Sequence, residues 1–221
     1  MHIPDGFLDP NICILMYLIS TGFLIWAWKG AKRTLSRAFV PLIAVSTALV
    51  FAGQMLNFPI LYGTSGHLIG GTFLAMFLGP HAAMISMSIV LLIQAVFFAD
   101  GGITTFGANL FNMAVIGGLS FYIVKFLSGG AVPSSKRFFA SVSLASWLST
   151  VLSALACGLE IGFSSAFASV GGIVMTVPAM LFWHIIIGVG EAAITTSLTA
   201  HLLRTQLPML HGLTILQEAP S

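Results

Sequence analysis

The stretch LIGGTFLAMFLGPHAAMISMSIVLLIQAVFFA, residues 68–99, contains no Asp, Glu, Lys or Arg. The pair Gly79-Pro80 divides it, and proline favours a break because it cannot continue a preceding helix. A helix that crosses the hydrocarbon core of a bilayer needs about 20 apolar residues. The stretch therefore predicts two connected membrane helices of about 16 residues each, one or both of them short or steeply placed in the bilayer.

Five further apolar windows surround this pair. They cover residues 10–28, 38–58, 101–124, 138–159 and 173–203, and only the last contains a charged residue, Glu191. The whole chain is 57% hydrophobic and 6% charged, which excludes an ordinary soluble domain. We expect residues 1–221 to form a single integral membrane domain, an all-α bundle of seven transmembrane helices. Six spans with one re-entrant hairpin is the alternative.

The basic residues set the expected orientation of the bundle. All eight lie at the ends of odd-numbered spans, which the positive-inside rule places in the cytoplasm: Lys29, Lys32, Arg33, Arg37, Lys125, Lys136, Arg137 and Arg204. The amino terminus is then outside and the carboxyl terminus inside. Four acidic residues before or between spans become external: Asp5, Asp9, Asp100 and Glu160. Because the basic residues flank spans and form no patch, nucleic acid is not an expected partner.

The chain begins with Met1 and His2. A free terminal nitrogen, the backbone nitrogen of His2 and its ring Nδ1 can bind one metal ion in fused five- and six-membered rings. Such a planar three-nitrogen chelator suits late first-row divalent ions, nickel or copper before zinc. We expect the initiator methionine to be retained because histidine is large. The alternative is that the pair Met-His is a coincidence, as in most chains that begin this way.

The expected topology places His67 on the same external side as the amino terminus. His67 can supply a fourth nitrogen, although a single histidine at a helix start is more often a capping or surface residue. Residues 4–6, Pro-Asp-Gly, form a strong turn signal. We therefore expect residues 1–9 to be an external metal-binding segment that inserts into the bundle. The glycine-rich external stretches 63–71 and 100–109 favour a small lidded site, with ordinary tight loops as the alternative.

Several polar residues lie inside or near the predicted spans. Five are close to external span ends, where they either orient His67 and the terminal segment or hold helices together: Gln54, Asn57, Gln94, Asn109 and Asn112. His184 and Glu191 lie deeper in the last span, seven residues apart on one helix face. We expect Glu191 to be too deep to bind a metal beside His2, and interpret it as structural or as part of a partner-facing surface.

Longer motifs connect these residues. They are residues 1–8 (MHIPDGFL), 54–59 (QMLNFP), 63–71, 94–114 and 188–195 (GVGEAAIT). Together they resemble the CbiM/NikM family, the metal-binding membrane components of energy-coupling factor transporters for cobalt and nickel. The resemblance runs from residue 1 to about residue 200. It implies seven transmembrane helices in a prokaryotic inner membrane, and metal ligation by the amine of Met1, the amide and ring nitrogens of His2, and the ring of His67.

The resemblance also implies partners. The chain has no Walker A pattern, so we expect a transporter subunit rather than an enzyme, with ATP hydrolysis by a pair of ABC ATPase subunits. A transmembrane coupling protein would join them, through the short cytoplasmic loops and the inner half of the last span. No fused carboxyl-terminal spans follow, which suggests a separate small membrane subunit and favours cobalt, for cobalamin synthesis, over nickel. The metal is transported substrate, and no permanently bound cofactor is expected.

Other residues allow two alternative functions. Gly63-Thr64-Ser65-Gly66 fits a Gly-x-Ser-Gly nucleophile turn, and His184 is a candidate base, which together give an intramembrane serine protease. This function predicts that Ser65→Ala is inactive and His2→Ala harmless. A channel or secondary transporter for a small solute would instead use His184 and Glu191 along a path, and would work without an ATPase.

Overall fold

The structure is a computed structural model that describes residues 1–34 and 39–204. Helices make up most of it: α1 (Pro10–Thr34), α2 (Val40–Gln54), α3 (Gly71–Leu78), α4 (Pro80–Phe97), α5 (Phe106–Asn109), α6 (Ile116–Ser128), α7 (Lys136–Gly162) and α8 (Ile173–Arg204). A π-helical turn, Leu110–Val115, joins α5 to α6, and a short 3₁₀ helix, Ser165–Val170, precedes α8. The predictions for Arg37 and for the carboxyl terminus lie outside the described residues.

Five helices in the described ranges are long and apolar enough to cross a membrane. They are Pro10–Arg33, Pro80–Phe97, Phe106–Ser128, Lys136–Gly162 and Ile173–Arg204. The chain is thus a multi-pass membrane protein. The remaining apolar helices are shorter: α2 has 15 residues and α3 has 8. At 1.5 Å per residue α3 is only about 12 Å long, less than half of the hydrocarbon core. The number of membrane crossings therefore stays a prediction.

The stretch 68–99 is divided where the sequence predicts, but into unequal parts. Gly79 has φ 77° and ψ 166°, and Pro80 is the first residue of α4. Proline is well suited to that position because the first helical N–H has no partner within the helix. The chain from His67 to Gly70 is not helical, so α3 begins only at Gly71. The two connected helices of about 16 residues each are therefore replaced by a non-helical segment, a short helix of 8 residues and one helix of 18 residues.

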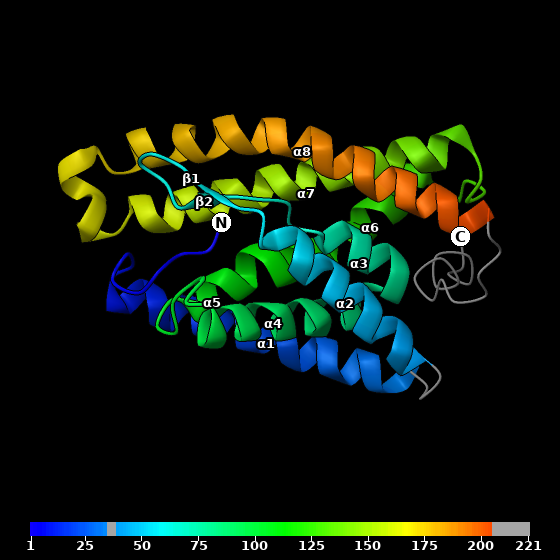
Figure 1. The fold of residues 1–221 in the computed structure, drawn as a ribbon, viewed down its shortest axis with the longest axis horizontal. Coiled ribbons are helices and arrows are strands. Elements are labelled where there is room, and N and C mark those ends of the chain that lie inside the picture. Colours follow the sequence, from blue (N-terminus) through cyan, green and yellow to red (C-terminus); the bar gives the residue numbers. More distant parts are fainter. Residues whose placement is uncertain (35–38, 205–221) are drawn as a thin grey trace.

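The helices pack in two groups around α3. The long helices α7 and α8 lie side by side as an antiparallel pair, and α1 packs against α4 on the other side of the molecule (Figure 1). Between them, all eight residues of α3 are buried. A Cβ atom built on Gly71 would lie 2.6 Å from the Cα of Gly117 in α6. Only two glycines allow this approach, which brings α3 into the centre of the bundle.

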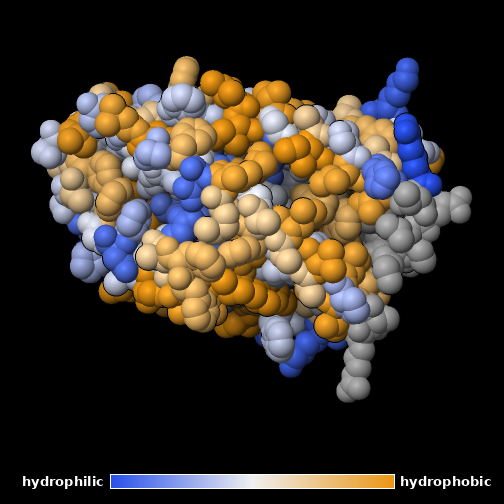
Figure 2. Space-filling model, in the orientation of Figure 1, coloured by the Kyte–Doolittle hydropathy of each residue, from blue (hydrophilic) through white to orange (hydrophobic). Residues whose placement is uncertain are grey.

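Charged and apolar side chains are separated along the molecule. The end of α1, the end of α6, the start of α7 and the end of α8 lie together, at the right of Figure 1, and carry Lys32, Arg33, Lys125, Lys136 and Arg204. The amino-terminal segment and the α4–α5 connection lie toward the other end. Figure 2 shows broad apolar areas between the two ends. Large apolar side chains such as those of Leu18, Phe126 and Val174 are exposed, as expected for a surface that faces lipid.

Candidate metal centre

The amino-terminal segment runs into the bundle, and Met1 and Ile3 are completely buried. A turn at Pro4, with Phe7 N donating to its carbonyl, directs the chain inward from α1. Asn109, at the end of α5, binds the backbone of Ile3 on both sides. Its Oδ1 accepts from Ile3 N at 2.8 Å and its Nδ2 donates to Ile3 O at 3.1 Å. These bonds satisfy backbone groups that would otherwise be buried without partners.

Two exposed carboxylates fasten the outer part of this segment. Asp5 accepts hydrogen bonds from the backbone nitrogens of Ile103 at 3.2 Å and Thr104 at 2.7 Å. Asp9 accepts from the backbone nitrogen of Ser165 at 3.0 Å and from its hydroxyl at 2.6 Å. The hydrogen bond from the Thr104 hydroxyl is the main cause that lowers the pKa of Asp5, and the Ser165 hydroxyl similarly lowers the pKa of Asp9. Two segments therefore help to hold the amino terminus: residues 100–109, which bind Asp5, and residues 164–170, which bind Asp9.

A short antiparallel hairpin brings the second part of the centre to the amine. Strands β1 (Phe58–Pro59) and β2 (Ser65–Gly66) pair with Pro59 opposite Ser65. The Met1 amine donates to the Ser65 carbonyl and, at 2.9 Å, to the Ser65 hydroxyl. The same hydroxyl accepts from the backbone nitrogen of His2 at 3.2 Å. Ser65 therefore holds two of the three nitrogens of the expected chelator side by side.

His67 presents one ring nitrogen to the amine. Its Nε2 lies 2.7 Å from the Met1 nitrogen, and its Nδ1 lies 2.8 Å from the carbonyl oxygen of Leu68. A carbonyl can only accept, so Nδ1 carries the proton and Nε2 has the lone pair. The sequence placed these two groups on one side of a membrane, and the structure brings them into direct contact.

His2 faces an acceptor at each ring nitrogen. Its Nε2 lies 3.0 Å from Gln94 Oε1, and a proton on Nε2 leaves on Nδ1 the lone pair that the expected chelate requires. That Nδ1 is buried and has no hydrogen-bond partner, although it lies 3.3 Å from Asp100 Oδ1. The rings of His2 and His67 stack with centroids 4.5 Å apart. A buried ring nitrogen without a partner is uncommon in folded proteins, and here it is the atom that the chelate requires.

Burial keeps these nitrogens uncharged at neutral pH. It lowers the pKa of the Met1 amine to about 5 and that of His2 to about 3. Burial also brings the pKa of His67 well below its ordinary value, and the nearby amine adds to this effect for both histidines. A metal ion competes with protons for the same lone pairs. All three groups therefore have lone pairs available without first losing a proton.

The spacing of the nitrogens suits one ion. At a metal–nitrogen distance of about 2 Å, two adjacent corners of a square lie about 2.8 Å apart, close to the 2.7 Å between the amine and His67 Nε2. Among the described residues no group of three His, Cys, Asp or Glu side chains could hold a metal ion. The expected metal centre uses backbone and terminal nitrogens as well as the two imidazoles.

The polar residues from the span ends mostly contact the centre or its supports. Gln94 and Asn109 hold the amino-terminal segment directly, Asn57 Nδ2 donates to Asp100 Oδ2 at 2.9 Å, and Gln54 Nε2 donates to the carbonyl of Ile69 at 2.7 Å. These contacts favour the orienting role over simple helix–helix contact. Asn112 differs, because it donates to Glu160 of α7. Sequence reasoning missed Ser65 and Asp100 as neighbours of the expected metal ligands, since each lies in a glycine-rich stretch whose path the sequence does not predict.

The protease pair is not assembled. Ser65 bonds to Met1 and His2, whereas His184 Nδ1 bonds to the carbonyl of Met180 at 2.8 Å and its Nε2 has no partner. Within the described ranges no hydrogen bond joins Ser65 to His184, so the serine has no adjacent base to activate it.

Comparison with known proteins agrees with the resemblance in the motifs. The profile of the CbiM family, described as the cobalt uptake substrate-specific transmembrane region, matches residues 2–209. The chain belongs to the CbiM family. The match includes His2, His67 and the GVGEAAIT motif, and it spans every helix that the structure describes.

Relatives in the CbiM family include longer and similar-sized proteins. A putative fused nickel transport protein NikMN of Archaeoglobus fulgidus is 38% identical over 91% of this chain, which spans 65% of that protein. A putative metal transport protein of Methanocaldococcus jannaschii is 37% identical over 95% of this chain and 94% of its own length. A solved structure described as a transition metal transporter has a TM-score of 0.84 and 32% identity, with 99% of this chain and 100% of that chain covered.

Proposed function

We propose that this CbiM-family chain is the metal-capturing membrane subunit of an energy-coupling factor transporter that imports divalent cobalt for cobalamin synthesis. One observation carries the proposal. The Met1 amine lies 2.7 Å from His67 Nε2, and the ring of His2, whose buried Nδ1 has no hydrogen-bond partner, stacks on the ring of His67. The backbone nitrogen of His2, beside the amine on Ser65, completes four nitrogens.

Capture by this set requires a proton transfer. The amide of His2 donates a hydrogen bond to the Ser65 hydroxyl in the absence of metal. To bind an ion, that amide nitrogen must lose its proton, so metal uptake releases a proton and strengthens as pH rises. The proposal also requires that the mature chain begins with an unmodified Met1, which amino-terminal sequencing of the purified protein tests.

The proposed topology has seven membrane crossings, with the amino terminus outside and the carboxyl terminus inside. The grouping of basic helix ends at one end of the molecule supports this orientation. In the proposed complex, a transmembrane coupling protein, a pair of ABC ATPases and a small accessory membrane subunit complete the transporter. The ATPases hydrolyse ATP, and this subunit binds and releases the ion.

Nickel is the second candidate cargo. Four nitrogens in a plane suit Ni²⁺ by geometry and by affinity order, and several relatives are named as nickel transport proteins, among them the fused protein of Rhodobacter capsulatus. Two relatives are named as cobalt transport proteins CbiM, from Lachnoclostridium phytofermentans and Clostridium cellulovorans. Competitive loading of the purified subunit with Co²⁺ and Ni²⁺, followed by uptake in cells that lack other transporters for either ion, separates the two.

The decisive experiment extends the chain by one residue before Met1. Extension moves the amine and replaces the chelate rings, so we expect Ni²⁺ and Co²⁺ affinity in isothermal titration to fall by more than about 100-fold, since even partners that only orient metal ligands contribute 10–100-fold. The matched control carries one additional residue after the last one, Ser221, and should bind as the unmodified chain does. Undiminished affinity after the amino-terminal extension would refute the proposed ligand set.

A further inference from the structure

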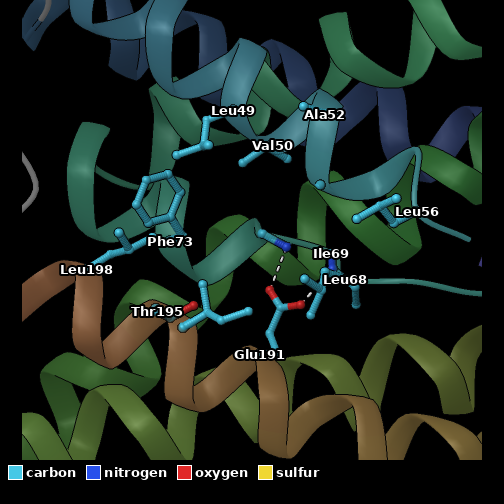
Figure 3. A pocket seen from close by; sticks show the side chains of 13 residues that line it. Leu49, Val50, Ala52, Leu56, Leu68, Ile69, Phe73, Glu191, Thr195 and Leu198 are labelled. Carbon is cyan, nitrogen blue, oxygen red and sulfur yellow. Dashed lines mark hydrogen bonds between the residues drawn. The ribbon is translucent and has the colours of Figure 1, made fainter.

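The backbone between His67 and α3 is held by a side chain from α8. Residues 67–70 are not helical, and they lead from the metal centre to the first turn of α3. Ile69 N donates to Glu191 Oε2 at 2.6 Å, and Gly70 N donates to Glu191 Oε1. Figure 3 shows the carboxylate pointing from α8 toward these two backbone nitrogens. One carboxylate thus binds two consecutive peptide groups, two and three residues after His67.

The same segment is held from the opposite side by α2. Gln54 Nε2 donates to the carbonyl oxygen of Ile69 at 2.7 Å. Ile69 is therefore fixed at its N–H by α8 and at its carbonyl by α2. Only Leu68 separates it from His67, and the carbonyl of Leu68 accepts the hydrogen bond from His67 Nδ1. The position of Ile69 consequently limits where the ring of His67 can lie and which tautomer it adopts.

Glu191 has few other ways to satisfy its carboxylate. The side chain is 3% exposed. A cavity of about 410 Å³ lies beside it, between α2 and α8, and its walls are mainly apolar side chains such as those of Leu49, Phe73 and Leu198 (Figure 3). Within the described part of the chain the two backbone N–H groups are its hydrogen-bond partners. A buried carboxylate is costly unless it is hydrogen-bonded, so this contact stabilises one particular path for residues 67–70.

The carboxylate also lies at the amino-terminal end of α3. Gly70 precedes the first residue of that helix and has no side chain with which to cap it. A negative group at a helix amino terminus is favourable because the helix dipole is positive there. Glu191 thus provides from α8 what the sequence of α3 lacks, and it fixes the point at which the non-helical segment becomes helical.

We propose that Glu191 is a positioning residue for the metal centre, which holds His67 in place against the Met1 amine through the backbone of Ile69 and Gly70. This inference rests on the proposed function. Glu191 does not touch the ion; it acts through His67. It also links the position of α8 to the fourth nitrogen, so that a displacement of α8 moves a metal ligand.

The test starts with Glu191→Gln, which keeps the shape of the side chain but replaces one acceptor oxygen with an N–H₂ donor that faces a backbone N–H. We expect Ni²⁺ affinity of the purified full chain to fall by about 10–100-fold, the usual effect of losing a partner that orients a metal ligand. Glu160→Gln is the matched control. It also neutralises a buried carboxylate in a span, but Glu160 contacts Asn112 rather than the His67 segment, and we expect its affinity to stay within about twofold of the unmodified chain.

A double-mutant cycle decides whether Glu191 acts through His67. If it does, Glu191→Gln has no further effect once His67→Ala has removed the ring. Additive losses would overturn the proposal, because the carboxylate would then act elsewhere. The visible absorption of bound Ni²⁺ gives a second readout. We expect the spectrum of Glu191→Gln to shift toward that of His67→Ala, and an unshifted spectrum with weakened binding would overturn the positioning role.

Failure of the two proposals can be distinguished. If neither His67→Ala nor the amino-terminal extension weakens binding, the proposed function itself fails. If both weaken binding and Glu191→Gln does not, only the positioning role fails. Should Glu191→Gln not fold, amide exchange of the unmodified protein decides the matter. We expect the amides of Ile69 and Gly70 to be protected without metal, and rapid exchange there would overturn the anchor.

Discussion

The two segments that meet at the metal centre are held in different ways. Residues 1–9 are fastened at their outer part by exposed carboxylates, as Asp5 binds Ile103 and Thr104. Residues 64–70 are fastened by buried groups, as Glu191 and Gln54 bind Ile69 from opposite helices. The outer contacts of the first segment can therefore break while its inner part stays bound to Asn109 of α5. The second can move only together with α2 or α8.

The largest loss of metal affinity should come from removing the proposed ligands themselves. His2→Ala removes the ring that closes the second chelate ring, whereas His67→Ala removes a single nitrogen from the other segment. We expect both to lower Ni²⁺ affinity by more than about 100-fold, because loss of a ligand costs more than loss of a partner that orients it, and His2→Ala to be the more severe. Isothermal titration measures both. Equal, small effects would mean that the two segments do not share one ion.

A smaller effect is expected from Asn109→Leu, which removes the buried part of the first segment's attachment. The N–H and carbonyl of Ile3 both lose their side-chain partner, and an unpaired buried backbone group costs about 1–3 kcal/mol. We expect metal affinity to fall by about 10–100-fold. Thr199→Val is the control, because that hydroxyl bonds only within α8, to the carbonyl of Thr195. Unchanged affinity in Asn109→Leu would mean that the segment docks without its buried anchor.

The smallest effect is expected at the exposed anchor, Asp5. Its pKa in the folded protein lies below the ordinary value of 3.8, chiefly because of the Thr104 hydroxyl. A lowered pKa means that the contact stabilises the docked segment fully above pH about 4 and that this contribution is lost as pH falls through the folded pKa. We expect Asp5→Asn to weaken Ni²⁺ binding only a few-fold, since exposed charged contacts contribute little.

The pH dependence of this anchor can be followed by amide exchange at Ile103 and Thr104, corrected for intrinsic rates. The unmodified chain should be better protected than Asp5→Asn at pH 6, and the difference should be lost as pH falls through the lowered pKa of Asp5. A difference that persists in acid would assign the protection to something other than the carboxylate.

The sequence predicted those parts of the fold that hydropathy controls. The apolar windows and the break at Gly79-Pro80 correspond to helices and to a helix end in the structure. It also placed His2 and His67 on the same side of the membrane, because that prediction needs only the order of the spans and the positions of the basic residues. The sequence allowed for a short helix in residues 68–78, but it did not predict that residues 68–70 are not helical, since a non-helical apolar segment and an apolar helix have the same hydropathy.

The role of Glu191 was missed for a geometric reason. Counting along a helix at 1.5 Å per residue puts this carboxylate deep below the external loops. The chain after His67 is instead not helical, and it meets Glu191 at Ile69 after only two residues. The interpretation of Glu191 as structural agrees with this contact. The carboxylate itself points into the bundle, toward α3, rather than outward toward a partner.

Met1 is completely buried, and His2 and His67 are 3% and 2% exposed. In the proposed site, the amino-terminal segment would therefore both bind the transported ion and cover it. A bound ion would have no path to water while residues 1–9 are docked. A chelator added to the medium should therefore remove the ion only as fast as residues 1–9 undock. How long the subunit retains its cargo would then depend on the contacts that hold residues 1–9, both the exposed ones of Asp5 and the buried ones of Asn109, as well as on the nitrogens.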